Sequence, residues 1–335
     1  MPCCFALAAT AGTVHHYTQP GIGCSRPIRK VRTCVRTLEM RAQRIGSVAA
    51  QALALKQDLR VVGTTSRGVF VQTTGRWIVF LSFEQALSPL TVTLGSGSVV
   101  LKVVMPGSAV RNGAGWLEFA DPSVRVFVDM RAPWLPPPPE SAPGPHAERL
   151  DRLAWLVSEV LSAREPSEVS ALLPHILEPA SMDQEGSSEF ERARSMRRLR
   201  HGLQTGSVES VANELTGFLG LGLGLTPSGD DLVIGLLLAL HRWGMQGWGA
   251  ARRSKLNHEV TRAAYARTPT ISANLIECAA AGGADERLLR AIDHLWTGYP
   301  ARTEALAALL DWGASSGTDA LAGMAIALTT PAGGH

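Results

Sequence analysis

The stretch APWLPPPPESAPGPH, residues 132–146, divides the chain into two parts of different character. Its prolines favour an extended, semi-rigid conformation, so we expect a linker over residues 132–146. The residues before it combine β-branched and aromatic side chains with glycine turns, whereas those after it carry apolar side chains at helical spacing. The sequence therefore predicts an α+β protein, with a barrel- or sandwich-like β-rich domain over residues 40–131 and a mostly α-helical domain over residues 147–335.

The β-rich part is clearest in LRVVGTTSRGVFVQTTGRWIVFLS, residues 59–82, where glycines separate three apolar runs. This pattern predicts a strand meander. Residues 90–104 and 124–130 predict further strands, and residues 44–57 a short helix. Residues 1–39 show no clear element; their basic second half could target the chain to an organelle. We expect a poorly ordered extension there, with translation starting near Met40.

Composition excludes several classes of protein. The chain has 335 residues, 45% hydrophobic and 18% charged, with a net charge of +3, which is too small to indicate nucleic-acid binding. No apolar run approaches the ~20 residues of a membrane span. Five cysteines form neither a disulfide framework nor a zinc pattern. We therefore expect a reduced, cytoplasmic protein.

The segment GLGLGLTPSGDDLVIG, residues 220–235, places two aspartates at the start of an apolar run. Thr226 is expected to cap a helix whose first position is Pro227. The next residues, Ser228, Gly229, Asp230 and Asp231, would then form the first turn, after a flexible glycine loop that includes Gly224. Such a helix start attracts anions through its free N–H groups and its dipole.

A second segment, SSGTDALAGMAIAL, repeats this arrangement near the C-terminus. Both copies read Ser-Gly-x-Asp-x-x-x-Gly and continue into an apolar helix. Because aspartate and the later glycine are four residues apart, they share a helix face, and glycine lets another backbone approach. We expect the two helix starts to face each other around one site. The alternative is a pair of capped core helices that pack through glycine.

Between the two copies lies ARTPTISANLIECAAAGG, residues 266–283. Thr268, before a proline, is expected to cap a helix that carries Ser272 and Asn274 among small residues. Arg267 and Thr268 would present a cation and a hydroxyl to an anionic substrate. A purely structural, capped and buried helix is the alternative.

Three blocks, GLGLGLTPSGDDLVIG, RTPTISANL and GASSGTDALAG, resemble signatures of the oxamate carbamoyltransferase subunit family. The resemblance extends over roughly residues 40–328. It implies one subunit of a multi-protein enzyme, with companion subunits, that moves a carbamoyl group between oxalurate and phosphate. The products are oxamate and carbamoyl phosphate, in the breakdown of allantoin and other purine nitrogen. One departure is Ala314, where the family commonly has histidine.

This resemblance gives the predicted site its chemistry. Carbamoyl transfer passes through an oxyanion, which helix N–H groups could stabilise, and Asp230 or Asp231 would act as general base or orient the nucleophilic nitrogen. We expect no cofactor, although a magnesium ion on Asp230 and Asp231 is an alternative. The residues expected to bind the anionic substrate and phosphate are Gly224, Thr226, Ser228, Gly229, Arg267, Thr268, Ser272, Asn274, Ser315, Ser316, Gly317 and Asp319.

Two other functions remain open: a non-catalytic anion-binding or assembly subunit, and a stand-alone magnesium-dependent enzyme. Other motifs are weaker. The arginine-rich residues 190–202 are typical of a solvated helix face, and the scattered histidines lack metal-ligand spacing. The segment around Ser315 lacks a serine-hydrolase elbow, and GLGLG lacks the dinucleotide-binding spacing. Ser66 and Arg67, in a predicted turn, could reach an anion.

Overall fold

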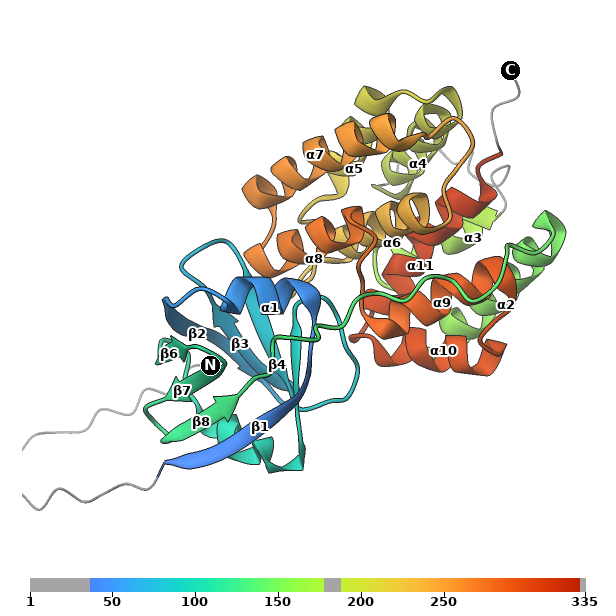
Figure 1. Cartoon of the computed structure of the whole chain (residues 1–335). Helices are drawn as coiled ribbons and strands as arrows, with labels where there is room; N and C mark the ends of the chain where they lie inside the picture. The colour runs from blue at the N-terminus through green and yellow to red at the C-terminus, as the bar shows by residue number, and fades with distance from the viewer. Residues whose placement is uncertain (1–36, 178–187, 332–335) are drawn as a thin grey trace, which may run out of the picture. The chain divides into compact units, whose positions relative to one another are not determined.

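The first part of the chain is a closed eight-stranded β-barrel in the computed structural model, which describes residues 37–177 and 188–331 (Figure 1). The strand order around the barrel is β1-β5-β4-β3-β2-β6-β7-β8. The predictions made for residues 1–36 lie outside the described residues. The strands are β1 (Leu38–Ile45), β2 (Asp58–Thr65), β3 (Gly68–Gln72), β4 (Ile78–Ser82), β5 (Thr91–Leu94), β6 (Ala109–Gly113), β7 (Trp116–Phe119) and β8 (Val124–Phe127).

The predicted meander is confirmed as the antiparallel run β2-β3-β4. In β2, Leu59 and Val61 alternate with exposed residues and point into the barrel core, as a strand with one buried face requires. The start of β3 requires glycine at position 68 for a steric reason. A Cβ atom on Gly68 would lie 2.3 Å from the carbonyl oxygen of Leu81. Parallel pairs of β1 with β8 and of β4 with β5 complete the barrel.

Other predicted boundaries in the β-rich part differ from the structure. The barrel starts within the predicted extension, since Leu38 and Glu39 already pair with β8. The helix expected over residues 44–57 is only α1 (Ser47–Leu53). The strand expected over residues 90–104 stops after β5, because a 3-10 helix (Ser96–Val103) follows. The hairpin of β6 and β7 was not predicted; its glycine turn separates two strands with charged outer faces.

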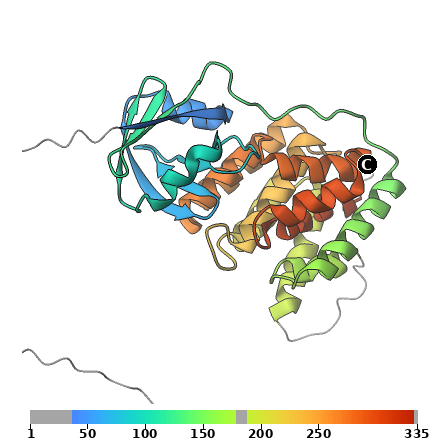
Figure 2. The same cartoon turned by 90° about the horizontal axis from the view of Figure 1, so that it is seen from below.

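The proline-rich stretch leads from the barrel to the helical part (Figure 2). Residues 128–145 form no helix or strand apart from a bridge between Trp134 and Gly46. The segment is held to the helices as well, because the Arg242 guanidinium donates to the carbonyl of Pro137 at 2.9 Å. The helices that follow are α2 (His146–Ala163), α3 (Leu173–Leu177), α4 (Ser188–Thr205), α5 (Val208–Phe218), α6 (Ser228–Arg242), α7 (Ala250–Arg267), α8 (Thr270–Ala280), α9 (Glu286–Thr297), α10 (Arg302–Asp311) and α11 (Ser316–Thr329).

Helices α6 and α11 form the centre of the helical part (Figure 1). Both are apolar on all sides and buried along almost their whole length, as a helix enclosed by others must be. Helix α9, at the surface, instead buries one face only. None of the described helices is long and apolar enough to cross a membrane.

Contacts between the barrel and the helices involve α8, α9 and the end of α10, where the Arg67 guanidinium donates to the carbonyl of Asp311 at 3.0 Å. The amide of Asn274 bonds to two backbone groups of the barrel, and Glu286 bonds to Arg44 and to the backbone of Leu87. These polar contacts fix the first turn of α9 and one side of α8 against the barrel wall.

Candidate functional site

The two similar helix starts lie side by side, as the repeat predicted. The hydroxyls of Thr226, before α6, and Ser316, at the start of α11, share a hydrogen bond of 3.2 Å. The later glycines of the repeat face the opposite helix: a Cβ atom on Gly235 would lie 2.0 Å from the carbonyl oxygen of Ala320, and one on Gly323 would lie 2.0 Å from that of Leu232. The predicted close approach through glycine is confirmed.

The earlier glycines of the repeat are also packing positions. A Cβ atom on Gly229 would lie 2.0 Å from the carbonyl oxygen of Phe218, and one on Gly317 would lie 1.9 Å from that of Leu309. Each helix start therefore rests against the end of an earlier helix, α5 or α10. This packing explains both glycines without a ligand.

The capping predictions for Thr226 and Thr268 are wrong by one residue. Pro227 and Pro269 occupy the cap positions of α6 and α8, with ψ angles of 144° and 143°, and neither helix has a side-chain cap. An extended proline leaves the preceding threonine too far from the first turn to cap it. The Thr226 hydroxyl contacts Ser316 instead, and the Thr268 hydroxyl donates to Asp230.

Asp230 joins three segments of the chain. Its carboxylate is fully buried and accepts hydrogen bonds from the Gly220 N–H at 2.8 Å, from the Ser272 hydroxyl at 2.7 Å and from the Thr268 hydroxyl. The donors come from the glycine loop and from the start of α8. Both carboxylate oxygens are thus occupied in holding this part of the fold together.

Asp231, its neighbour, has no such partners. Its side chain is fully buried, and neither carboxylate oxygen has a hydrogen-bond partner among the described residues. Burial raises the pKa of Asp231 well above 3.8, and the nearby carboxyls of Asp319 and Asp230 raise it further. The hydroxyls of Ser316 and Thr226 are near enough to oppose this shift, but lie outside hydrogen-bond geometry.

Asp319 on α11 is the counterpart of Asp231. It is fully buried, and one of its oxygens accepts from Ser167, whereas the other has no partner among the described residues. Burial raises the pKa of Asp319, and the hydroxyls of Ser167, Ser228 and Ser315 oppose the shift. We call the six residues Thr226, Ser228, Asp231, Ser315, Ser316 and Asp319, with Ser167, the tip cluster.

Ser167 is the member of the tip cluster that sequence reasoning missed. It lies in the turn after α2, where its oxygen also accepts from the N–H groups of Val169 and Ser170 at 3.1 and 3.0 Å. In the sequence this turn resembles an ordinary helix connection. No spacing relates it to the two repeat copies, so only the folded chain connects it with Asp319.

Several predicted binding residues lie outside the tip cluster. Arg267 is exposed, and its guanidinium donates to the carbonyl of Thr216 at 3.2 Å. Asn274 is buried against the barrel, where its oxygen accepts from the N–H of Ile78 at 2.8 Å. Gly224, with φ of +103°, lies in the exposed loop over the tips. Ser272 and Thr268 belong with Asp230.

The tip cluster is closed in this structure, because Asp231 and Asp319 are both 0% exposed. A cavity of about 370 Å³ lies beside it, lined by Leu225 of the glycine loop, Thr270 and Ile271 of α8, and barrel residues such as Thr65 and Phe70. The loop residue Leu223 is 96% exposed. Leu225 directly precedes Thr226, so the glycine loop connects this cavity with the tip cluster.

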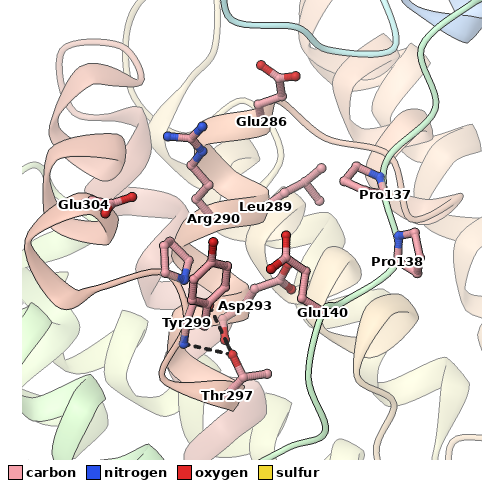
Figure 3. Close-up of a pocket in the computed structure, with 11 residues that line it drawn as sticks. Pro137, Pro138, Glu140, Glu286, Leu289, Arg290, Asp293, Thr297, Tyr299 and Glu304 are labelled. Atoms are coloured by element: carbon pink, nitrogen blue, oxygen red, sulfur yellow. Dashed lines mark hydrogen bonds between the residues drawn. The ribbon is translucent and has the colours of Figure 1, made fainter.

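A second pocket, of about 250 Å³, lies between α9 and the proline-rich stretch (Figure 3). Asp293 and Glu140 line it, together with Arg290 and Tyr299. Asp293 is held by the Arg242 guanidinium at 2.6 Å. None of the residues predicted to bind substrate lines this pocket. Within the described part of the chain, no group of three or more His, Cys, Asp or Glu side chains is arranged to hold a metal ion.

One comparison with known proteins gave a match to a segment of the helical part. Residues 218–328 match the model of the family described as "Oxamate carbamoyltransferase subunit AllH". The match runs from the end of α5 almost to the end of α11 and contains all three motifs, so it confirms the predicted family resemblance over residues 218–328 and does not reach residues 40–217. Neither the curated proteins nor the solved structures that were compared gave a match to this chain.

Proposed function

We propose that this chain is a subunit of a carbamoyltransferase complex that acts on a small ureido acid. In the reaction that the family name suggests, oxalurate and phosphate give oxamate and carbamoyl phosphate, a step of purine-nitrogen breakdown in the cytoplasm. The family match supports a role beside companion subunits.

The observation that carries the proposal is the joining of two helix starts around the unpaired carboxyl of Asp231. The positive ends of the two helix dipoles favour anionic oxygens, and the neighbouring hydroxyls can donate, whereas the N–H groups of Gly229 and Gly317 already donate to backbone carbonyls. Such donors would bind a carboxylate or phosphate and stabilise the oxyanion of carbamoyl transfer. Both proposed reactants are anions of this kind.

Asp231 is better suited than Asp230 to move a proton. The oxygens of Asp230 are occupied by three donors, whereas those of Asp231 are free among the described residues. Burial raises the pKa of Asp231, which makes its carboxylate a stronger base than an exposed one. We therefore assign the general-base role to Asp231 and a positioning role to Asp230.

Substrate can reach Asp231 only if the glycine loop moves. Gly220, Gly222 and Gly224 all have positive φ angles, between +78° and +105°, a conformation that other residues rarely adopt. The loop also exposes Leu223 and Leu225 to solvent. The loop moves in the isolated chain, and a companion subunit that covers these leucines would hold it in the moved position.

The experiment is co-purification of the chain with the products of neighbouring genes, followed by an assay of oxalurate with phosphate. We expect the complex to release oxamate and Asp231→Asn to lower kcat by about 100-fold, a typical loss of general-base catalysis. Asp151→Asn, at an exposed position on α2, is the matched control and should retain full activity.

Two outcomes favour the alternative functions. If the complex is active and Asp231→Asn keeps the full rate, the chain is a non-catalytic binding or assembly subunit. If the purified chain alone turns over oxalurate only when Mg²⁺ is added, it is a stand-alone magnesium-dependent enzyme. The carboxyls of Asp230 and Asp231 would then be the metal ligands to test.

A further inference from the structure

The tip cluster contains more hydrogen-bonding atoms than the described residues satisfy. Both oxygens of Asp231 and one oxygen of Asp319 are buried and have no partner there. Folded proteins rarely leave buried polar atoms unpaired, because each such atom costs about 1–3 kcal/mol. Two unsatisfied carboxyl groups at one place therefore point to a missing donor.

No cation among the described residues supplies that donor. None of the ion pairs formed by the described residues includes Asp231 or Asp319. The other charged group that acts on Asp231 is again a carboxyl, that of Asp230. Arg164, on the segment beside α11, donates to the backbone carbonyls of Leu310, Gly313 and Ala314 instead. The positive charge near the pair comes from the starts of α6 and α11.

We propose that Asp231 and Asp319 form one carboxyl pair that binds the NH2 group of a carbamoyl or ureido ligand. A carbamoyl group carries N–H donors beside a carbonyl acceptor. The tip cluster offers the complementary set: carboxyl oxygens that accept, beside the hydroxyls of Thr226 and Ser316 that can donate. This proposal rests on the proposed function for the identity of the ligand. It adds which residues bind the nitrogen end of that ligand.

The repeat gives this pair a structural basis. Each helix start contributes one carboxyl at the same position of the Ser-Gly-x-Asp motif. The glycines that bring α6 and α11 into contact also fix the spacing of the two carboxyls. An NH2 group between them would be held by both copies, so loss of either aspartate should remove the same selectivity.

Oxamate and oxalate are the probes that test the pair, because oxamate has an NH2 group where oxalate has an oxygen. Calorimetric titration of the full chain at neutral pH should show oxamate binding more tightly by about 10-fold or more, the usual effect of one hydrogen bond to a charged group. Asp231→Asn and Asp319→Asn should each abolish this preference. Asp151→Asn should retain it.

Equal binding of the two probes, or binding of neither, by the wild-type chain would overturn the pair, since its oxygens would then be satisfied by a shared proton or buried water. This comparison needs no variant and stands even if an asparagine variant fails to fold. If a complex turns over oxalurate although its chain binds oxamate and oxalate equally well, the carboxyl pair is overturned and the proposed carbamoyl transfer stands. Oxamate selectivity without turnover in any complex would instead overturn the proposed carbamoyl transfer.

Discussion

Asp230 and Asp231 are adjacent in the sequence and equally buried, yet their surroundings differ completely. Successive residues of a helix point about 100° apart, so Asp230 faces the glycine loop and α8 while Asp231 faces α11. One carboxyl is used for the fold, and the other keeps its hydrogen-bonding capacity. The difference follows from the neighbouring helices and not from the residue type.

The raised pKa of Asp231 predicts a specific dependence of stability on pH. A carboxyl whose pKa is higher in the folded state favours folding at acidic pH, and this contribution is lost as the pH rises from about 4 through the raised pKa. Asp231→Asn cannot ionise. We therefore expect its free energy of unfolding to fall less than that of the wild type between pH 4 and pH 8, as measured by urea denaturation.

Asp319 still titrates in that variant and gives the curve its remaining slope. Asp151→Asn should follow the wild-type curve throughout. Parallel curves for Asp231→Asn and the wild type would show that Asp231 ionises in the folded chain as readily as in the unfolded chain.

At the scale of single residues, the sequence indicated the residues of the tip cluster. It could not show which carboxyl groups already have hydrogen-bond partners. The Ser-Gly-x-Asp repeat was sufficient to predict Ser228, Ser316 and Asp319 as neighbours of Asp231. It could not show that Asp230 is held by three donors or that Ser167 reaches Asp319. Both facts depend on segments whose spacing along the chain is arbitrary.

At the scale of elements, the glycines of the repeat decide how closely α6 and α11 approach. The sequence predicted this contact, because a glycine four residues after each aspartate shares its helix face. It misplaced the helix starts, since Thr-Pro at both α6 and α8 puts proline at the cap. The contact between α6 and α11 was therefore predicted correctly. The hydrogen-bond partners of Thr226 and Thr268 are instead set by tertiary contacts.

Gly323→Ala should separate the two helices. The new Cβ atom would lie 2.0 Å from the carbonyl oxygen of Leu232 and 2.5 Å from the N–H nitrogen of Leu236, and backbone atoms cannot move aside cheaply. We expect a loss of about 3 kcal/mol in the free energy of unfolding, the upper end for overpacking. Thermal unfolding monitored by circular dichroism measures it.

Gly217→Ala on α5 is the matched control, because its Cβ atom would meet nothing within 4 Å. Alanine is the better helix former there, so this variant should gain about 0.5–1 kcal/mol. A Gly323→Ala variant as stable as the wild type would contradict the close contact between α6 and α11.

At the scale of the whole molecule, Asn274 links the two structural parts. It is fully buried; its amide nitrogen donates to the carbonyl of Arg76 at 3.0 Å and to the Tyr265 hydroxyl at 2.7 Å, and its oxygen accepts from Ile78. The sequence predicted both parts and their order from composition and periodicity. It gave no sign of this link, which joins an α8 side chain to backbone atoms of the barrel.

Asn274→Ala should weaken the connection between the barrel and the helices. It leaves the Ile78 N–H and the Arg76 carbonyl without their partner, at about 1–3 kcal/mol for each buried group. We expect one calorimetric unfolding transition for the wild type and two for Asn274→Ala. Asn257→Ala removes a single hydrogen bond, from the side-chain amide to the carbonyl of Ala280 within the helical part. This variant should lower the midpoint temperature of unfolding but keep one transition.

The first strand, β1, closes the barrel by pairing with β5 and β8. This pairing affects how the chain folds during synthesis. During synthesis β1 leaves the ribosome first, but its two partners, β5 and β8, start only at Thr91 and Val124. Until then its edges are open to other chains, and pairing between such distant segments is slow. Nascent chains should therefore recruit a chaperone at this strand until β8 has emerged.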